Sequence, residues 1–348
     1  VNVIANEVVC NTEATTVLFT TDNTVGVTAY AWTSDIEIGA GLTGAGDMSF
    51  IAASEGTDPL VATIIVTPTF TNEGVSCDGP TESFTITVNP TAQIDVTTSQ
   101  VLCNNDLTES VAFTTQNTNG DTSYTWINDT PSIGLASNGS GDITSFIATN
   151  LGTEPLVATI TVTPLFSNEG TDCNTGTSEA FTITVNPTAQ VETPLDQVVC
   201  NAEATTVVFE TENTVGVTAY AWTSDIEIGA GLTGAGDMSF TAANEGTDPL
   251  VATIIVTPTF TNEGVSCDGP TESFTITVNP TAQVDNVSDS FVFSGELTPS
   301  ISLFSQSTDA TFSWVASPDA NITGLVNDSG SNSLIPSETF YNFEAIPL

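Results

Sequence analysis

The chain is a tandem array of repeats, and no other feature constrains its fold as strongly. The segment Val8 to Gln93 recurs as Val198 to Gln283 with six of 86 positions changed, and a diverged copy lies between them. Self-similarity at a fixed period is the signature of a repeat architecture. We expect four domains: repeat 1 (residues 1–93), repeat 2 (94–190), repeat 3 (191–283) and an incomplete repeat 4 (284–348). Because both ends fall inside the pattern, we also expect the sequence to be a segment of a longer polypeptide.

Each repeat is expected to be a succession of short strands. In repeat 1 the candidates are rich in Val, Ile, Thr and aromatic residues and are separated by turn residues: 16–21, 27–33, 48–53, 60–70 and 83–88. The last alternates, so that Phe84, Ile86 and Val88 face one way. Roughly seven short strands, with a tryptophan on the third, predict an all-β fold of tandem immunoglobulin-like sandwiches.

Cysteine and tryptophan recur at fixed places in the first three repeats. The cysteines are Cys10 and Cys77, Cys103 and Cys173, and Cys200 and Cys267. Three like-spaced pairs predict an oxidising compartment and one disulfide inside each repeat, Cys10–Cys77, Cys103–Cys173 and Cys200–Cys267. The tryptophans, expected to anchor the cores, are Trp32, Trp126, Trp222 and Trp314. Repeat 4 has Phe293 where repeat 2 has Cys103, so it is expected to have no disulfide.

Charge excludes some classes of partner. The sequence has 42 Asp and Glu and no Lys, Arg or His, which gives a net charge of −42. Nucleic acids and anionic lipid surfaces would repel such a chain. No apolar run is long enough to cross a bilayer, so we expect no membrane insertion of this segment.

Several short motifs resemble a known family. They are the Val-Val-Cys-Asn opening at Val8, Tyr-x-Trp at Tyr30, Val-Thr-Pro at Val66, and the run from Phe84 to Gln93. Together they resemble the PKD-like, Ig-like tandem repeats of giant surface adhesins of Bacteroidota, exported by the type IX secretion system and best known from gliding motility. Repeat 1 departs from the Trp-x-Phe-Gly-Asp-Gly motif of PKD domains proper, since it has Ile36 and Glu37 after Asp35. The resemblance implies an extracellular, cell-surface stalk or filament without catalytic residues.

Two motifs suggest chemistry. Gly39 to Gly44 matches the G-x-G-x-x-G dinucleotide fingerprint, but we expect a strand after it rather than a helix, which favours a glycine-rich connection. A pair of carboxylates could act as a glycosidase or bind Ca²⁺. The acidic residues that recur in repeats 1 and 3 instead predict solvent-facing loops: Asp35, Glu37, Asp47 and Glu55, matched by Asp225, Glu227, Asp237 and Glu245. We expect no enzyme and no cofactor, with Ca²⁺ the one ion left open.

The junctions between repeats share the sequence Asn-Pro-Thr-Ala-Gln. Its first two residues are Asn89 and Pro90, Asn186 and Pro187, and Asn279 and Pro280. Proline fixes its own φ and favours an extended residue before it, so each junction is expected to be short and stiff and the array to form an extended rod. The function that this favours is a structural stalk or filament segment of a secreted adhesin. The alternatives are repeated modules that bind surface glycans or proteins, and a self-assembling filament subunit whose partners are copies of itself.

Overall fold

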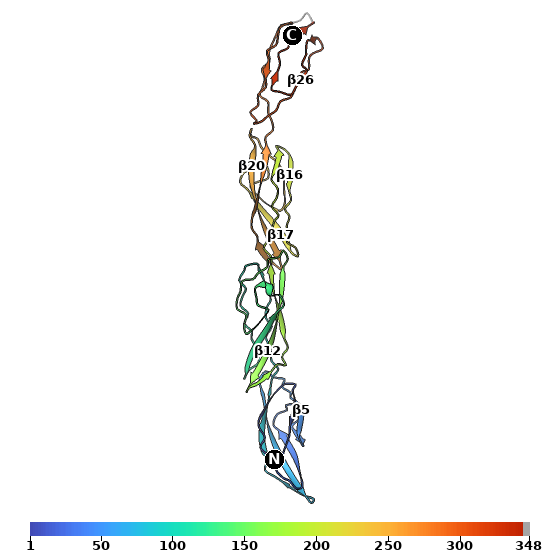
Figure 1. The fold of residues 1–348 in the computed structure, drawn as a ribbon, viewed down its shortest axis with the longest axis vertical. Helices are drawn as coiled ribbons and strands as arrows, with labels where there is room; N and C mark the ends of the chain where they lie inside the picture. Colours follow the sequence, from blue (N-terminus) through green and yellow to red (C-terminus); the bar gives the residue numbers. More distant parts are fainter. Residues whose placement is uncertain (344–348) are drawn as a thin grey trace. The chain divides into compact units, whose positions relative to one another are not determined.

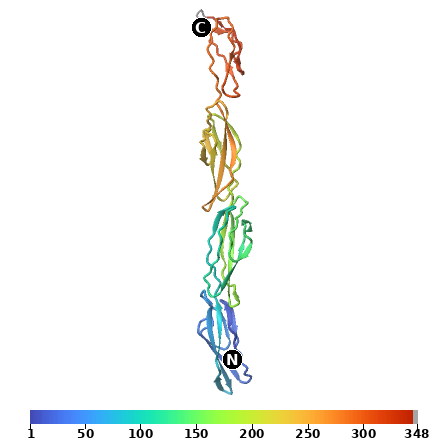
Figure 2. The same cartoon turned by 90° about the vertical axis from the view of Figure 1, so that its left-hand side faces the viewer.

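The computed structural model describes residues 1–343 and confirms the all-β prediction (Figures 1 and 2). The last five residues of the expected repeat 4, 344–348, lie outside the described residues. Within the described part, the one helical element is a short 3-10 helix, η1 (Pro131–Ile133).

Repeat 1 is a two-layered sandwich. Its larger sheet has the strand order β1-β8-β6-β3-β4, with β7 also paired to β6, and its smaller sheet is β2-β5. The strands are β1 (Glu7–Cys10), β2 (Ala14–Val17), β3 (Val27–Ser34), β4 (Thr43–Ala45), β5 (Met48–Ile51), β6 (Leu60–Asn72), β7 (Val75–Asp78) and β8 (Glu82–Asn89). All pairs are antiparallel except β1 with β8, which is parallel.

Repeats 2 and 3 reproduce this plan. Repeat 2 has β9 (Gln100–Cys103), β10 (Asp121–Asn128), β11 (Asn138–Ser140), β12 (Leu156–Asn168), β13 (Thr171–Cys173) and β14 (Glu179–Asn186). Two isolated bridges, Leu107 to Ile147 and Val111 to Ile143, replace its smaller sheet. Repeat 3 has β15 (Gln197–Cys200), β16 (Ala204–Val207), β17 (Val217–Ser224), β18 (Thr233–Ala235), β19 (Met238–Thr241), β20 (Leu250–Asn262), β21 (Val265–Asp268) and β22 (Glu272–Asn279).

The described part of repeat 4 contains only two-residue strands in three separate pairs, β23-β27, β24-β26 and β25-β28. Their bounds are β23 (Ile301–Ser302), β24 (Trp314–Val315), β25 (Ile322–Thr323), β26 (Ser329–Gly330), β27 (Leu334–Ile335) and β28 (Tyr341–Asn342). Up to residue 343, nothing corresponds to the long strands β6, β12 and β20 of the other repeats.

Three hydrophobic cores are buried in the described residues, and each is built from one of repeats 1 to 3. Trp32, Trp126 and Trp222 lie in these cores and are 6 to 7% exposed, whereas Trp314 is only half-buried. Each tryptophan ring covers a glycine of the neighbouring strand. A Cβ built on Gly44 would lie 2.1 Å from the ring of Trp32, and Gly139, Gly234 and Gly330 meet their tryptophans in the same way.

This packing explains the glycine-rich segment of repeat 1. Gly44, the last glycine of the G-x-G-x-x-G match, pairs with Trp32 in the register of β3 and β4. The segment therefore leads into a strand and makes room for the core tryptophan, which is not the strand-to-helix turn that a dinucleotide site requires.

Four of the five predicted strands, 27–33, 48–53, 60–70 and 83–88, are observed with ends shifted by at most two residues. Of the predicted strand 16–21, only residues 16 and 17 lie in a strand, β2. Phe84, Ile86 and Val88 are 3% exposed or less, as the alternation of β8 predicted. The sequence patterns missed β1, β4 and β7, which are three or four residues long. Cys77 lies in β7.

By its internal contacts the chain divides into two compact units. Unit one comprises residues 1–188, 214–216 and 261–267, and unit two comprises 189–213, 217–260 and 268–348. Repeats 1 and 2 thus belong to one unit, together with two short segments of repeat 3. The repeat boundaries at 93, 190 and 283 remain predictions.

Candidate functional site: clamps between successive repeats

The disulfides join successive repeats. Cys10 is bonded to Cys173 and Cys103 to Cys267, with Cα–Cα distances of 5.4 and 5.6 Å. Cys77 and Cys200 are free and exposed. The predicted pairings inside each repeat, Cys10–Cys77, Cys103–Cys173 and Cys200–Cys267, are therefore wrong.

The strand register gives the physical reason. Cys10 pairs with Asn89, one residue beyond the pair of Val88 with Leu60, so it lies level with the start of β6, with β8 between them. Cys77 pairs with Phe70, ten residues further along the same strand. At about 3.3 Å per residue, the two cysteines lie at opposite ends of the sandwich, roughly 33 Å apart. A disulfide requires Cα atoms within about 7 Å.

A β-hairpin carries the second cysteine of each pair to the preceding repeat. In repeat 2 the hairpin is β12-β13, whose turn uses Glu169 and Gly170 at positive φ. Asn168, before this turn, donates from Nδ2 to Oδ1 of Asn89 at 2.9 Å. Asn89 is fully buried, so the junction asparagine of repeat 1 is covered.

The same contacts recur one repeat later, within unit one. Asn262 donates from Nδ2 to Oδ1 of Asn186 at 3.0 Å, and Asn186 donates back to the carbonyl of Asn262 at 3.3 Å. We call this combination of hairpin, asparagine pair and disulfide a clamp. The first clamp contains Cys10, Asn89, Asn168 and Cys173, and the second contains Cys103, Asn186, Asn262 and Cys267.

A loop of the following repeat makes a further set of contacts. Asn117 accepts from the backbone N–H of Gln93 at 2.7 Å and donates to the carbonyl of Thr91 at 3.1 Å. The backbone N–H of Thr118 donates to the carbonyl of Thr57 at 3.1 Å. Asn213 likewise accepts from the N–H of Gln190 at 2.6 Å. These bonds tie the residues of each junction to a loop of the following repeat, and the stiffness of the junctions remains a prediction.

Each junction is also tied to its own repeat, by a side-chain hydrogen bond that recurs in repeats 1 to 3. The asparagine after the first cysteine donates to the threonine of each Asn-Pro-Thr sequence: Asn11 to Thr91 at 2.8 Å, Asn104 to Thr188 at 3.0 Å and Asn201 to Thr281 at 2.9 Å. Thus the Asn-Pro residues singled out in the sequence, at 89–90, 186–187 and 279–280, lie beside the cysteine-bearing strands β1, β9 and β15.

A glycine after the hairpin allows the close approach of the preceding junction. A Cβ on Gly176 would lie 2.6 Å from the carbonyl oxygen of Ala92, and one on Gly269 would lie 1.9 Å from that of Ala189. Sequence reasoning missed these two glycines. Their signal is the Cys-x-Gly or Cys-x-x-Gly that follows the second cysteine of each repeat.

Several carboxylates have a structural role. The chain has no Lys, Arg or His side chain to pair with them, and they accept hydrogen bonds from backbone N–H groups instead. Asp35 accepts from the N–H of Thr63 at 2.7 Å, Asp47 from that of Phe19 at 2.8 Å, and Glu37 from those of Gly39 and Gly41 at 2.7 and 2.9 Å. Asp225, Asp237 and Glu227 repeat these bonds in repeat 3. Such charge-assisted bonds are stronger than neutral ones, so these acids hold loops in place and are not merely solvent-facing.

Some carboxyl groups have altered acidity for the same reason. The backbone N–H of Thr159 beside Asp129 holds the pKa of that carboxyl below its usual value. The N–H of Thr275 lowers the pKa of Asp196 in the same way, at a distance of 2.6 Å. Burial raises the pKa of Glu7.

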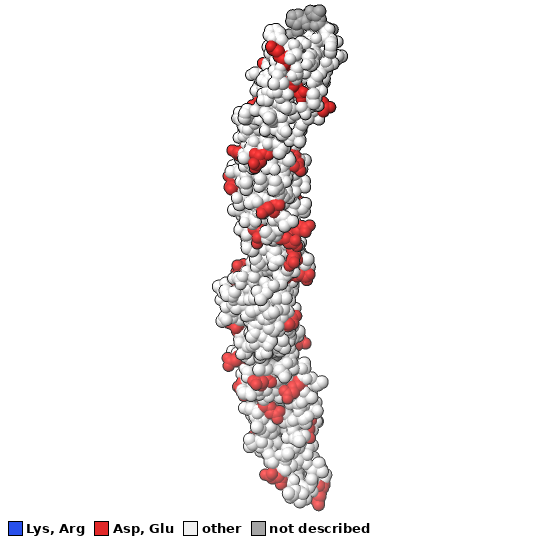
Figure 3. Space-filling view, turned by 45° about the horizontal axis from the view of Figure 1, so that its top comes forward, with Lys and Arg blue, Asp and Glu red and all other residues white. Residues whose placement is uncertain are grey.

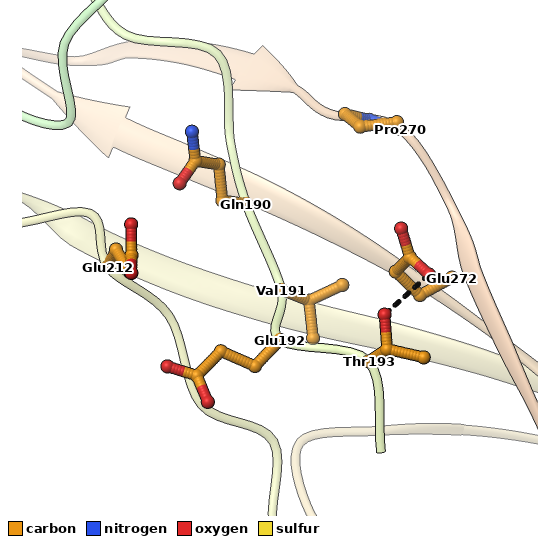
Figure 4. Close-up of a pocket in the computed structure, with 7 residues that line it drawn as sticks. All are labelled: Gln190, Val191, Glu192, Thr193, Glu212, Pro270 and Glu272. Atoms are coloured by element: carbon orange, nitrogen blue, oxygen red, sulfur yellow. Dashed lines mark hydrogen bonds between the residues drawn. The ribbon is translucent and has the colours of Figure 1, made fainter. Parts of the chain in front are cut away.

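Red carboxylates are spread over the face shown in Figure 3, with no blue side chain among them. A shallow pocket of about 300 Å³ in repeat 3 is lined by Gln190, Val191, Glu192, Thr193, Glu212, Pro270 and Glu272. Figure 4 shows Glu272 accepting a hydrogen bond from Thr193 at 2.8 Å, with Glu192 and Glu212 on the other side of the Val191 backbone. The three carboxylates do not converge on one point.

Within residues 1–343 no group of at least three His, Cys, Asp or Glu side chains could hold a metal ion. In the same residues, no helix has the length and apolar character needed to span a membrane.

Comparisons with known proteins find similarity in fold only. Neither a protein-family model nor a curated protein matches the chain. Similar solved structures include titin domains I67–I69, with 12% identity, coverage of 79% of this chain and 96% of that one, and a TM-score of 0.39. The three N-terminal domains of the bacteriophage RB49 outer capsid protein Hoc have 13% identity, 77% and 94% coverage and a TM-score of 0.36. Mouse cadherin-23 EC22–24 has 10% identity, 81% and 97% coverage and a TM-score of 0.33.

Proposed function

We propose that this chain is a structural segment of an extracellular stalk, in which clamped Ig-like repeats carry mechanical load. The observation that carries the proposal is that both disulfides run between successive repeats. Disulfides persist in oxidising environments, which supports a location outside the cell. A bridge between repeats adds nothing to recognition by a single repeat, but it gives tension a second covalent path across the junction.

The two bridges also limit how far the chain can be stretched. The shortest covalent path runs from Val1 to Cys10, crosses to Cys173, returns to Cys103, crosses to Cys267 and continues to Leu348. This path contains about 160 residues, so the fully extended oxidised chain would span roughly 550 Å, against roughly 1,200 Å for the reduced chain. The clamps therefore protect most of repeats 1 to 3 from being drawn out.

Single-molecule pulling on the two ends tests this role. We expect the oxidised chain to reach less than half the extension of the reduced chain, and a Cys10→Ser, Cys103→Ser double variant to behave as the reduced chain does. Equal extension of oxidised and reduced chains would remove the mechanical basis of the proposal.

The extended form is tested separately. With no cation to pair with 42 carboxylates, repulsion between units is strong at low ionic strength and largely screened beyond about 10 Å at 0.1 M salt. If the junctions rather than charge repulsion keep the chain extended, small-angle scattering should show an extended particle both at low ionic strength and at 0.1 M salt. A particle that collapses when salt is added would contradict the stalk, and saturable glycan binding by one excised repeat would favour a binding module.

The finer part of the proposal is the origin of the chain. Its tandem repeats, paired cysteines and acidic surface support a surface adhesin of the kind that Bacteroidota export through type IX secretion. In such a protein the segment would hold an adhesive region away from the cell. Finding it in the cytoplasm of its native cells, instead of at the surface or in the medium, would refute this assignment.

A further inference from the structure

Repeat 4 has an open apolar groove. A cavity of about 350 Å³ is lined mainly by apolar side chains, among them Ile301, Trp314, Leu325, Ile335 and Phe340. Val315, next to Trp314, is 81% exposed. Side chains of this kind normally form a buried core, and here they line a groove that is open to solvent.

Repeat 2 shows what covers the corresponding residues. Val111 and Ile143 form a bridge there, as Ile301 and Ile335 do in repeat 4, and Leu135 follows Gly134 as Leu325 follows Gly324. In repeat 2 these residues and Trp126 belong to one buried core. The remainder of that core comes largely from β12 and β14: Ala158, Ile160, Val162, Phe181, Ile183 and Val185.

The strand that would receive this cover is unpaired on one side. In repeat 2, β10 has two neighbours, β11 and β12. Its counterpart β24 pairs with β26, the counterpart of β11, and has no second neighbour in the described residues. Its other edge therefore offers backbone groups to an incoming strand.

Repeat 3 supplies a matching free cysteine, also within unit two. Cys200 N–H donates to Glu203 at 2.8 Å, as Cys10 N–H does to Glu13, so the two cysteines sit in the same turn. Cys10 and Cys103 are each bonded to a hairpin cysteine of the following repeat, whereas Cys200 is exposed and free. Asn279 is half-buried, while its counterparts Asn89 and Asn186 are fully buried.

We propose that repeat 4 binds a β-hairpin and strand of the same type as β12-β13-β14, and that the hairpin cysteine forms a disulfide with Cys200. The hairpin strand pairs with the free edge of β24 and covers the groove, and its tip completes a third clamp on repeat 3. A small disulfide such as oxidised glutathione is the oxidant: the two protein thiols form one S–S bond and release two molecules of glutathione. The proposal rests on the groove and the clamps, and it stands whether or not the chain is a stalk.

A synthetic peptide of residues 156–186 tests the proposal, because it contains the whole β12-β13-β14 segment with Cys173. Incubated with the full chain and oxidised glutathione, it should form a one-to-one adduct at Cys200. Docking raises the local concentration of the peptide thiol, so we expect the adduct at Cys200 to form at least ~10-fold faster than at Cys77, which is equally free. Quenching of Trp314 fluorescence by acrylamide should fall in the adduct.

Two variants and a second peptide serve as controls. Cys200→Ser should abolish the fast adduct and Cys77→Ser should leave it unchanged. A peptide with aspartate at the positions of Ile160 and Val162 should lose the preference for Cys200. Equal labelling of both cysteines, or an equally fast reaction of the aspartate peptide, would overturn the proposal.

A graft decides the question if the peptide aggregates. Pro347-Leu348 repeats the Pro155-Leu156 sequence at the start of β12, so residues 157–186 can be appended after Leu348. Peptide mapping under non-reducing conditions should then find Cys200 bonded to the grafted cysteine. A graft whose cysteine stays free, or bonds to Cys77 instead, would show that the groove does not take this segment.

Discussion

Cys10 is bonded to Cys173, a residue 163 positions further along the chain and in the next repeat. Beside this bond, the side-chain amides of Asn89 and Asn168 meet at 2.9 Å. The end of one sandwich is thereby joined to the hairpin of the next by a covalent bond and a buried hydrogen bond. The structure is therefore held together by the junctions between repeats as well as by the repeats themselves.

Breaking the first clamp should destabilise the chain. Cys173 is fully buried, so Cys173→Ser removes a bridge and leaves a buried hydroxyl, and we expect a loss of about 2–4 kcal/mol in the free energy of unfolding of repeats 1 and 2. The matched control is Cys77→Ser at the same place in repeat 1, where the exposed thiol has no partner and the change should stay within about 0.5 kcal/mol. Urea unfolding of both variants measures the difference. A Cys10–Cys77 bond in the peptide map of the unmodified chain would contradict the clamp.

Asn117 should be far more sensitive to truncation than its counterpart in repeat 1. Asn117→Ala removes the bonds to Gln93 and Thr91 and leaves the backbone N–H and carbonyl of these half-buried residues without that partner, which costs about 1–3 kcal/mol. Asn23 occupies the same place in repeat 1 and is exposed. Asn23→Ala should therefore change the melting temperature little, and comparable losses from both variants would show that Asn117 has no special role at the junction.

Gly269 should not tolerate a side chain. Its added Cβ would lie 1.9 Å from the carbonyl oxygen of Ala189, a backbone atom that cannot move without shifting the junction. We expect Gly269→Ala to lower stability by roughly 1–3 kcal/mol through overpacking. Gly79→Ala is the control, since its Cβ would meet the ring of Pro68 at 3.1 Å and would stay 3.7 Å from the Pro68 carbonyl oxygen. Thermal unfolding of the two variants should separate them clearly, and a harmless Gly269→Ala would mean that Ala189 is not held against this glycine.

Acid should destabilise the chain through Asp129 and Asp196. Hydrogen bonds from Thr159 and Thr275 lower the pKa of these carboxyls in the folded state. The unfolded chain therefore binds protons more readily, so their contribution is complete above an unfolded pKa of about 3.9 and is lost as pH falls through the depressed folded pKa. Urea midpoints between pH 5 and pH 2 should fall, and less steeply in Asp196→Asn than in the control Asp289→Asn. Identical acid profiles in the two variants would rule out this role for Asp196.

The local features of the repeats could be predicted from the sequence. Alternation in Phe84, Ile86 and Val88 depends only on the two-residue period of a strand, and the core tryptophan follows from its place in the predicted strand 27–33. The acidic composition excluded side-chain ion pairs without any structure. The roles of Asp35 and Asp47 were missed because a carboxylate that bonds to an N–H 28 residues away leaves no local pattern.

The disulfide partners were decided only by the tertiary structure. Cys10 and Cys103 each have two second cysteines available at regular spacings, one in their own repeat and one in the next, and the sequence does not distinguish them. What distinguishes them is the length of β6, β12 and β20, which carries the second cysteine to the far end of its sandwich. That end meets the preceding repeat, because the hairpin extends past the core to Asn89 in one case and to Asn186 in the other. Pairing therefore depends on how one folded repeat packs against another, a contact between residues about 160 positions apart.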